Sequence, residues 1–219
     1  MSTTIPIHPA EYSPEVIEVF ATLIRPGEHI HDPYAGRGLR LGALCDQLGR
    51  TFTGTDIEAW PDSDPRVDGG NSEMPLTYPA KPFTVICSPT YVNKRLSDYA
   101  KVGPLPTTQL RGRRDYAISL GRPVHPDSTV LLTGRHAKHD DGAAYYAAHG
   151  RAIRHWDQRA IVNVDSPIGA DWCRLLEQHG YRIVQIIPAY TQRYGGLDNA
   201  DKRADFEVVI EAWRFSDDG

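Results

Sequence analysis

The chain has 219 residues, 40% of them hydrophobic and 24% charged, which is the composition of one large globular domain or two small ones. Its formal net charge of −4 argues against a protein that coats duplex DNA, because such binding relies on lysine and arginine that neutralise phosphates. The three cysteines are widely spaced and match neither a zinc cluster nor a disulfide framework, and neither a membrane span nor a secretory signal is recognisable, so we expect a cytoplasmic protein.

Helices and strands are predicted to alternate along the first part of the chain. Ser13 can cap a helix whose first position is Pro14, and apolar residues then recur on one face until Pro26-Gly27. Turn residues delimit the segments that follow, and Gly49 closes the second helix. The expected elements are a strand over 28–32, a helix over 39–48, a strand over 51–56, a loop rich in Pro, Asp and Gly up to residue 70, and a strand over 83–87.

The same alternation returns near the C-terminus. We expect a helix over 143–156, a strand over 160–164, a helix over 170–178 ended by Gly180, and strands over 182–187 and 206–213. Alternating strands and helices form a mostly parallel sheet that is covered on both faces. Ligands of such sheets bind at the carboxyl ends of the strands, so we expect the functional site there.

A glycine-rich turn follows the first strand. In Gly36-x-Gly38 the backbone N–H groups can approach a ligand, because glycine tolerates positive φ and has no side chain. Asp56 ends the next strand, 24 residues after Asp32, where a carboxylate can accept hydrogen bonds from both ribose hydroxyls. Leu41 replaces the third glycine of a dinucleotide motif, so a nucleoside without a pyrophosphate fits better. Taken singly, Asp32 could also be a helix cap and Asp56 an ordinary loop acid.

Four segments in this order resemble the half of amino-group DNA methyltransferases that binds S-adenosyl-L-methionine (AdoMet): His8–Glu15, Arg25–Glu28, Asp32–Gly38 and Leu48–Asp56. The resemblance implies a Rossmann-like class I fold, with a seven-stranded, mostly parallel sheet, an antiparallel last strand and helices on both faces. It implies cofactor contacts from His8, Pro9, Asp32, Tyr34, Gly36, Gly38, Asp56, Ile57 and Asn71. Leu39-Arg40 departs from the serine or threonine that often follows the second glycine of the family.

A short polar and aromatic motif follows the strand over 83–87. Ser88 and Pro89 offer a hydroxyl and a rigid carbonyl that can accept hydrogen bonds from an amino group, and Tyr91 can stack on a flipped base. The motif resembles the Ser-Pro-Pro-Tyr loop of the same family, in which serine is typical of cytosine N4 enzymes; Thr90 replaces the second proline. The alternative is a turn whose Tyr91 packs against the domain. Cys87 precedes the motif and is interpreted as a core residue, not as a nucleophile for C5 methylation.

A basic insertion is predicted over residues 92–135. Between residues 92 and 125 the chain has seven Lys and Arg against two Asp, although the protein as a whole is acidic. The candidate DNA contacts are Lys94, Arg95, Arg111, Arg113 and Arg114. A solvated loop is the alternative. The nearby group His136, His139, Asp140 and Asp141 has no established ligand spacing, so we expect no metal.

These features predict one methyltransferase domain over residues 1–219, with the cofactor half before the catalytic loop, as in the family's gamma arrangement. The expected reaction is methyl transfer from AdoMet to an exocyclic amino group of DNA, with cytosine N4 preferred over adenine N6. Two alternatives stay open: an RNA or small amino compound as the acceptor, or an inactive module that binds AdoMet or DNA. The sequence sets no oligomeric state, and a dimer is compatible with it.

Overall fold

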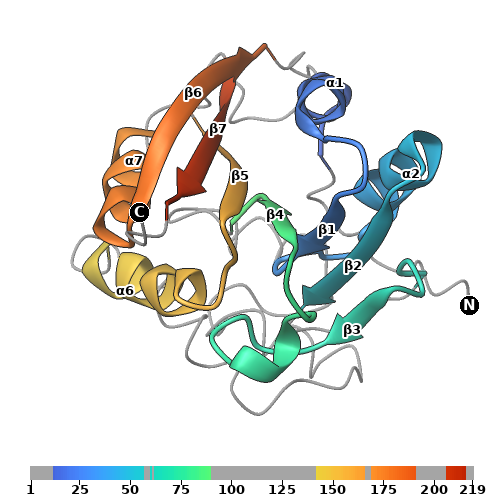
Figure 1. Ribbon diagram of the computed structural model, residues 1–219, viewed down its shortest axis with the longest axis horizontal. Coiled ribbons are helices and arrows are strands. Elements are labelled where there is room, and N and C mark those ends of the chain that lie inside the picture. The colour runs from blue at the N-terminus through green and yellow to red at the C-terminus, as the bar shows by residue number, and fades with distance from the viewer. Residues whose placement is uncertain are drawn as a thin grey trace, which may run out of the picture.

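The computed structural model describes residues 12–56, 60, 62–89, 142–165, 169–190 and 206–215. These residues form a central seven-stranded sheet and four α-helices, shown in Figure 1. In chain order, the elements are α1 (Pro14–Leu23), β1 (His29–Asp32), α2 (Leu39–Leu48), β2 (Thr51–Asp56), β3 (Val67–Gly69), the 3-10 helix η1 (Pro75–Thr77), β4 (Thr84–Cys87), α6 (Gly142–Ile153), β5 (Arg159–Asp165), α7 (Gly169–Gln178), β6 (Tyr181–Ala189) and β7 (Glu207–Arg214).

The sheet has the strand order β3-β2-β1-β4-β5-β7-β6. Every pair from β3 to β5 is parallel, whereas β7 is antiparallel to both β5 and β6. The predicted mostly parallel sheet with an antiparallel last strand is therefore confirmed. Because β1 and β4 are neighbours and their chain connections lead to opposite sides, the strand order reverses between them.

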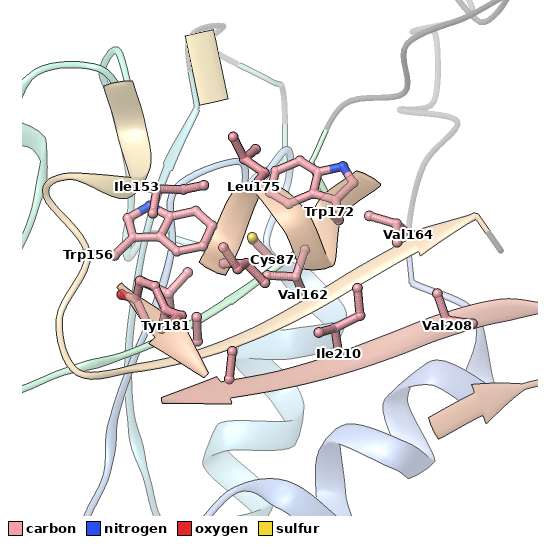
Figure 2. Close-up of a cluster of buried hydrophobic side chains, with 14 of the residues drawn as sticks. Cys87, Ile153, Trp156, Val162, Val164, Trp172, Leu175, Tyr181, Val208 and Ile210 are labelled. Carbon is pink, nitrogen blue, oxygen red and sulfur yellow. The ribbon is translucent and has the colours of Figure 1, made fainter. Parts of the chain in front are cut away.

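Helices cover both faces of the sheet. Figure 1 shows α1 and α2 together on one side and α6 and α7 on the other. Consecutive strand residues alternate between two hydrophobic clusters, so that Val85 and Cys87 pack with the α6/α7 side and Ile86 packs with the α1/α2 side. Figure 2 shows Trp156 and Trp172 in the first of these clusters, beside Val162 of β5 and Ile210 of β7. The two clusters bury both faces of the sheet. The loops at the carboxyl ends of its strands lie outside these clusters and are therefore available to form a site.

Local signals set the helix boundaries that the sequence predicts. The Ser13 hydroxyl accepts a hydrogen bond from the Val16 amide at 3.2 Å, with Pro14 at the first helical position of α1. Helix α2 covers exactly the expected residues, because Gly38 and Gly49 flank it in left-handed conformations. The expected loop up to residue 70 was wrong in one respect, since β3 lies within it. Only Val67 of its three residues is apolar, so this short edge strand shows no alternation of apolar and polar residues from which it could be predicted.

A buried ion network lies at the amino ends of β1 and β5, where Glu28 precedes β1, Arg159 begins β5 and Glu211 of β7 lies beside it. The Arg159 guanidinium, 2% exposed, contacts Glu211 Oε1 at 2.7 Å, Glu28 Oε1 at 2.6 Å and the Leu23 carbonyl at 2.7 Å. Glu211 is equally buried, so it depends on this partner.

Replacing Arg159 with alanine should lower the free energy of unfolding by about 3–5 kcal/mol, because Glu211 is left buried without its main cation. Urea denaturation would measure this loss. Arg174→Ala is the matched control: its ion pair with Asp171 is largely exposed, so we expect a loss below about 1 kcal/mol. Equal losses in the two variants would contradict the burial argument.

Candidate active site

The predicted site residues gather where the strand order reverses, at the carboxyl ends of β1 and β4. Asp32 is the last residue of β1, and Ser88 directly follows β4. The two strands are hydrogen-bonded neighbours, with Ile30 opposite Thr84 and His31 opposite Val85. In open α/β sheets the crevice at this point is the usual ligand site, so the topology brings the two predicted motifs together.

The glycine turn after β1 packs tightly against the end of β2. Gly36 and Gly38 have φ values of 57° and 68°, which glycine adopts without strain. The Ala35 amide donates to the Thr55 carbonyl at 2.9 Å, and the Gly36 amide donates to Asp56 Oδ2 at 2.9 Å. A Cβ atom on Gly38 would lie 2.5 Å from Val67 Cγ2, so only glycine fits there. The turn is thus a close backbone cradle held by an acidic residue.

Asp32 is a buried carboxylate with two hydrogen-bond donors. Its side chain accepts from the Tyr12 hydroxyl at 2.7 Å and from the Tyr34 amide at 2.9 Å, and the residue is 1% exposed. Burial is the main cause that raises the pKa of Asp32 to about 7; the two hydrogen bonds lower it and the nearby charge of Asp56 raises it. A cationic ligand would stabilise the charged form of such a carboxylate strongly, because the ligand charge compensates for the hydration that the carboxylate lost on burial.

The ends of β2 and β3 add further polar groups. Asp56 is 3% exposed, and its Oδ1 accepts from the Trp60 indole N–H at 3.1 Å. Asn71 follows β3 and is 2% exposed; its side-chain oxygen accepts from the Glu73 amide at 3.0 Å and so shapes the loop. Asp56 ends β2 and Asn71 follows the paired strand β3, so the two residues lie at the carboxyl ends of neighbouring strands. Cofactor contact by either residue stays a prediction.

Two buried hydroxyls at this edge fit a polar ligand. Thr55 Oγ1 and Ser72 Oγ have no hydrogen-bond partner among the residues that the structure describes, although the two residues are only 5% and 1% exposed. Buried hydroxyls normally find a partner, so unpaired ones beside a backbone cradle and two carboxylates suit a ligand with several donors and acceptors. AdoMet is a ligand of that kind: its ribose and adenine carry donors and acceptors, and its ammonium and sulfonium groups are positively charged. The residues present therefore fit this cofactor.

The catalytic motif is partly described. Ser88 is half-buried and Pro89 is buried, directly beyond β4. The backbone of Ser88 lies close enough to the Tyr12 hydroxyl to lower its pKa, against the larger effect of burial, and the same hydroxyl donates to Asp32. Cys87 is fully buried in the α6/α7 cluster, and burial raises the pKa of its thiol well above the usual value, which supports the core interpretation and disfavours a thiolate nucleophile.

Several predicted site residues lie outside the described part of the chain, and they stay predictions. They include the cofactor candidates His8, Pro9 and Ile57, and the catalytic candidate Tyr91 together with the preceding Thr90. The basic insertion over 92–135 also falls there, with the DNA-contact candidates Lys94, Arg95, Arg111, Arg113 and Arg114. Within the described residues, no group of three or more His, Cys, Asp or Glu side chains is placed to hold a metal ion.

The structure adds two residues for which the sequence gave no site role. Tyr12 contacts Asp32 as described, and His149 of α6 contacts Tyr34. His149 is 1% exposed; its Nδ1 lies 2.8 Å from the Tyr34 hydroxyl, and the two rings meet edge to face with centroids 5.1 Å apart. The partners are 115 positions apart in the sequence, so no local pattern could have predicted the pair.

Comparisons with known proteins identify the fold. No protein-family model and no curated protein matches this sequence. Among solved structures, magnesium protoporphyrin IX methyltransferase from Synechocystis PCC 6803, with AdoMet bound, is similar: the TM-score is 0.50 and the identity 15%, over 92% of this chain and 79% of that one. A Thermoplasma acidophilum protein matches with a TM-score of 0.50 and 12% identity, over 92% of this chain and 83% of that one.

The chain therefore has the Rossmann-like fold of AdoMet-dependent methyltransferases. At these identities the likeness concerns the fold, and the activity has to be argued from the site. Among the described residues, no helix is long and apolar enough to cross a membrane.

Proposed function

We propose that this protein is an AdoMet-dependent methyltransferase that acts on an exocyclic amino group of a DNA base, with cytosine N4 preferred over adenine N6. One observation carries the proposal: the glycine turn with Asp32 and the Ser88-Pro89 motif meet at the reversal point between β1 and β4. A methyl donor bound by the turn would thereby face an acceptor bound at the motif, as direct transfer requires.

The cofactor half of the site is assigned to acidic and backbone groups. Asp32 would attract the ammonium group of the methionine moiety, and Asp56 would accept hydrogen bonds from the ribose hydroxyls. The cradle around Gly36 and Gly38 brings the backbone close enough for contact. When bound, AdoMet supplies an electrophilic methyl group on a positive sulfonium.

The acceptor half has to activate a weak nucleophile. The lone pair of an exocyclic amine is delocalised into the base, so hydrogen bonds accepted from both amino hydrogens help by drawing the nitrogen toward tetrahedral geometry. Ser88 Oγ and the Pro89 carbonyl are the two proposed acceptors. Proline suits this task because its fixed φ and missing N–H leave a rigid carbonyl. The preference for cytosine rests on serine, not aspartate, at the head of the motif.

A second candidate keeps the reaction and changes the acceptor to RNA or a small amino compound. The net charge of −4 favours the small amino compound, because DNA and RNA are both phosphate-rich partners that are attracted by positive surfaces. DNA contact is assigned instead to the basic residues of the 92–135 segment, and this assignment is part of the proposal. A dimer would be compatible with either acceptor.

Isotope-labelled AdoMet, incubated with unmodified DNA and then analysed by nucleoside mass spectrometry, tests the proposal. We expect labelled N4-methylcytosine, and a parallel reaction with Arg111, Arg113 and Arg114 changed to Gln should lose at least about tenfold in activity at physiological salt. Labelled N6-methyladenine instead would show that the target base is adenine and not cytosine. Label only in RNA or in a small amine would establish the second candidate, and a chain that binds AdoMet but modifies no acceptor would refute catalysis.

A further inference from the structure

Tyr12 contacts both halves of the proposed active site through one hydroxyl. The O–H donates to Asp32 Oδ2 at 2.7 Å. The Ser88 backbone lies near enough to the phenolic oxygen to lower the pKa of the Tyr12 hydroxyl, against the larger effect of burial, which raises it. One hydroxyl of Tyr12 therefore bonds the end of the cofactor strand and lies beside the head of the catalytic motif.

The rest of Tyr12 is held in place by two helices. Its ring meets the Phe20 ring of α1 edge to face, with centroids 5.1 Å apart and planes at 77°. Its carbonyl accepts a hydrogen bond from the Arg40 guanidinium, in the first turn of α2. Arg40 stands where the resembling family often has serine or threonine, so this departure has a structural use. With ring and backbone fixed, the position of the hydroxyl is determined by the fold and not by the ligand.

We propose that Tyr12 is a positioning residue for the methyl-transfer reaction, setting the Asp32 carboxylate and the Ser88 backbone in one fixed relation. The inference rests on the proposed function and adds a residue to it. Tyr12 touches neither reacting group in this scheme; it acts through the Asp32 contact to the cofactor and through the placement of Ser88 beside the amino group.

The electrostatics of Asp32 give this role a distinctive signature. The Tyr12 hydrogen bond lowers the pKa of Asp32, while burial and the charge of Asp56 raise it, and Cys87 is a further titratable group that interacts with it. Removing the hydroxyl should raise the pKa of Asp32 further, so that more of it is protonated and neutral at pH 7. Binding of the cationic cofactor would then weaken at neutral pH and recover at higher pH.

Tyr12→Phe tests the proposal, because it removes the hydroxyl and keeps the ring contact with Phe20. At pH 7 we expect calorimetry to show about tenfold weaker AdoMet binding, the effect of one hydrogen bond to a charged group, recovering to within about twofold of the parent at pH 9. With AdoMet saturating, kcat should fall about tenfold at both pH values with KM for the acceptor unchanged, since Ser88 is no longer held.

Tyr181→Phe is the matched control. Tyr181 is a buried tyrosine whose hydroxyl, like that of Tyr12, donates one hydrogen bond, here to the Asp157 carbonyl, but it begins β6 and so lies at the opposite edge of the sheet. Its AdoMet affinity and kcat should match the parent. A Tyr12→Phe variant with parental affinity and kcat from pH 6 to 9 would overturn the inference alone, as would a loss of AdoMet affinity that is the same at every pH. A parent chain that binds no AdoMet would overturn the proposed function and this inference with it.

Discussion

Asp32→Asn should stabilise the cofactor-free protein above neutral pH and, at the same time, weaken AdoMet binding by at least about 100-fold. Both effects have the same origin, because a buried carboxylate without a cation destabilises the fold and attracts a cationic ligand. Asparagine keeps the size of the side chain and an oxygen that can accept from the Tyr34 amide. Stability and function would thus be opposed at one residue.

The sign of the stability effect follows from the pKa of Asp32, about 7 in the folded chain against 3.8 for the unfolded one. The contribution of Asp32 to the free energy of unfolding is fully favourable below the pKa that it has in the unfolded chain. It is lost as pH rises from there through the pKa in the folded chain, at about 1.4 kcal/mol per pH unit. The advantage of Asp32→Asn over the parent should therefore grow from pH 4 to pH 7, toward about 4 kcal/mol, and then level off. Urea denaturation at each pH unit measures it.

His31 acts in the opposite direction on the same strand. Burial and the neighbouring His29 lower the pKa of His31 to about 3, so its contribution to stability is lost as pH falls below about 6.5. Between pH 4 and 6.5 the slopes due to Asp32 and His31 nearly cancel in the parent. The Asp32→Asn variant should expose the His31 slope and gain stability steeply across this range.

Asp68→Asn is the control for both measurements, because Asp68 is an exposed carboxylate on the edge strand β3. Its difference from the parent should stay small at every pH. An advantage of Asp32→Asn that does not change with pH would show that Asp32 is charged to the same degree in the folded and unfolded chains. Undiminished AdoMet affinity in that variant would remove Asp32 from the cofactor site.

Most of the fold follows from local features of the sequence. The sequence predicts helix α2 to the residue because two glycines flank it, and β2 because Gly49 precedes the segment and a loop rich in Pro, Asp and Gly follows it. The order of the strands in space was expected only as a class, since pairing depends on contacts far apart in the chain. Strand β3 was missed because its single apolar residue, Val67, gives no pattern.

The site residues also divide into those that a local motif predicts and those that only the packed structure brings together. The glycine turn and the acid that ends β2 are sequence motifs, because short segments carry their own geometry. The Tyr12–Asp32 and Tyr34–His149 contacts join residues 20 and 115 positions apart, and only the packed structure brings them together. The pKa of Asp32 is likewise a property of burial, which the sequence does not state.

Ser88→Ala should lower kcat about 100-fold while AdoMet affinity stays within about twofold of the parent. The substitution removes the proposed side-chain acceptor of an amino hydrogen but leaves the Ser88 backbone beside Tyr12, so the cofactor half is undisturbed. Activity should not vanish, because the Pro89 carbonyl remains as the second acceptor. Single-turnover methylation of DNA with AdoMet saturating would isolate the chemical step from binding.

The matched control is Thr22→Ala, which also removes one hydroxyl, from the exposed surface of α1, where it donates to the Val19 carbonyl. It should methylate at the parental rate. If Ser88→Ala methylates as fast as the parent, then Ser88 does not activate the amino group, and the acceptor must be held by other residues. If neither the parent nor Ser88→Ala transfers methyl groups although both bind AdoMet, the chain is a cofactor-binding module without catalysis. The replacement of the second proline of the motif by Thr90 would then be the sequence change that accompanies the loss of activity.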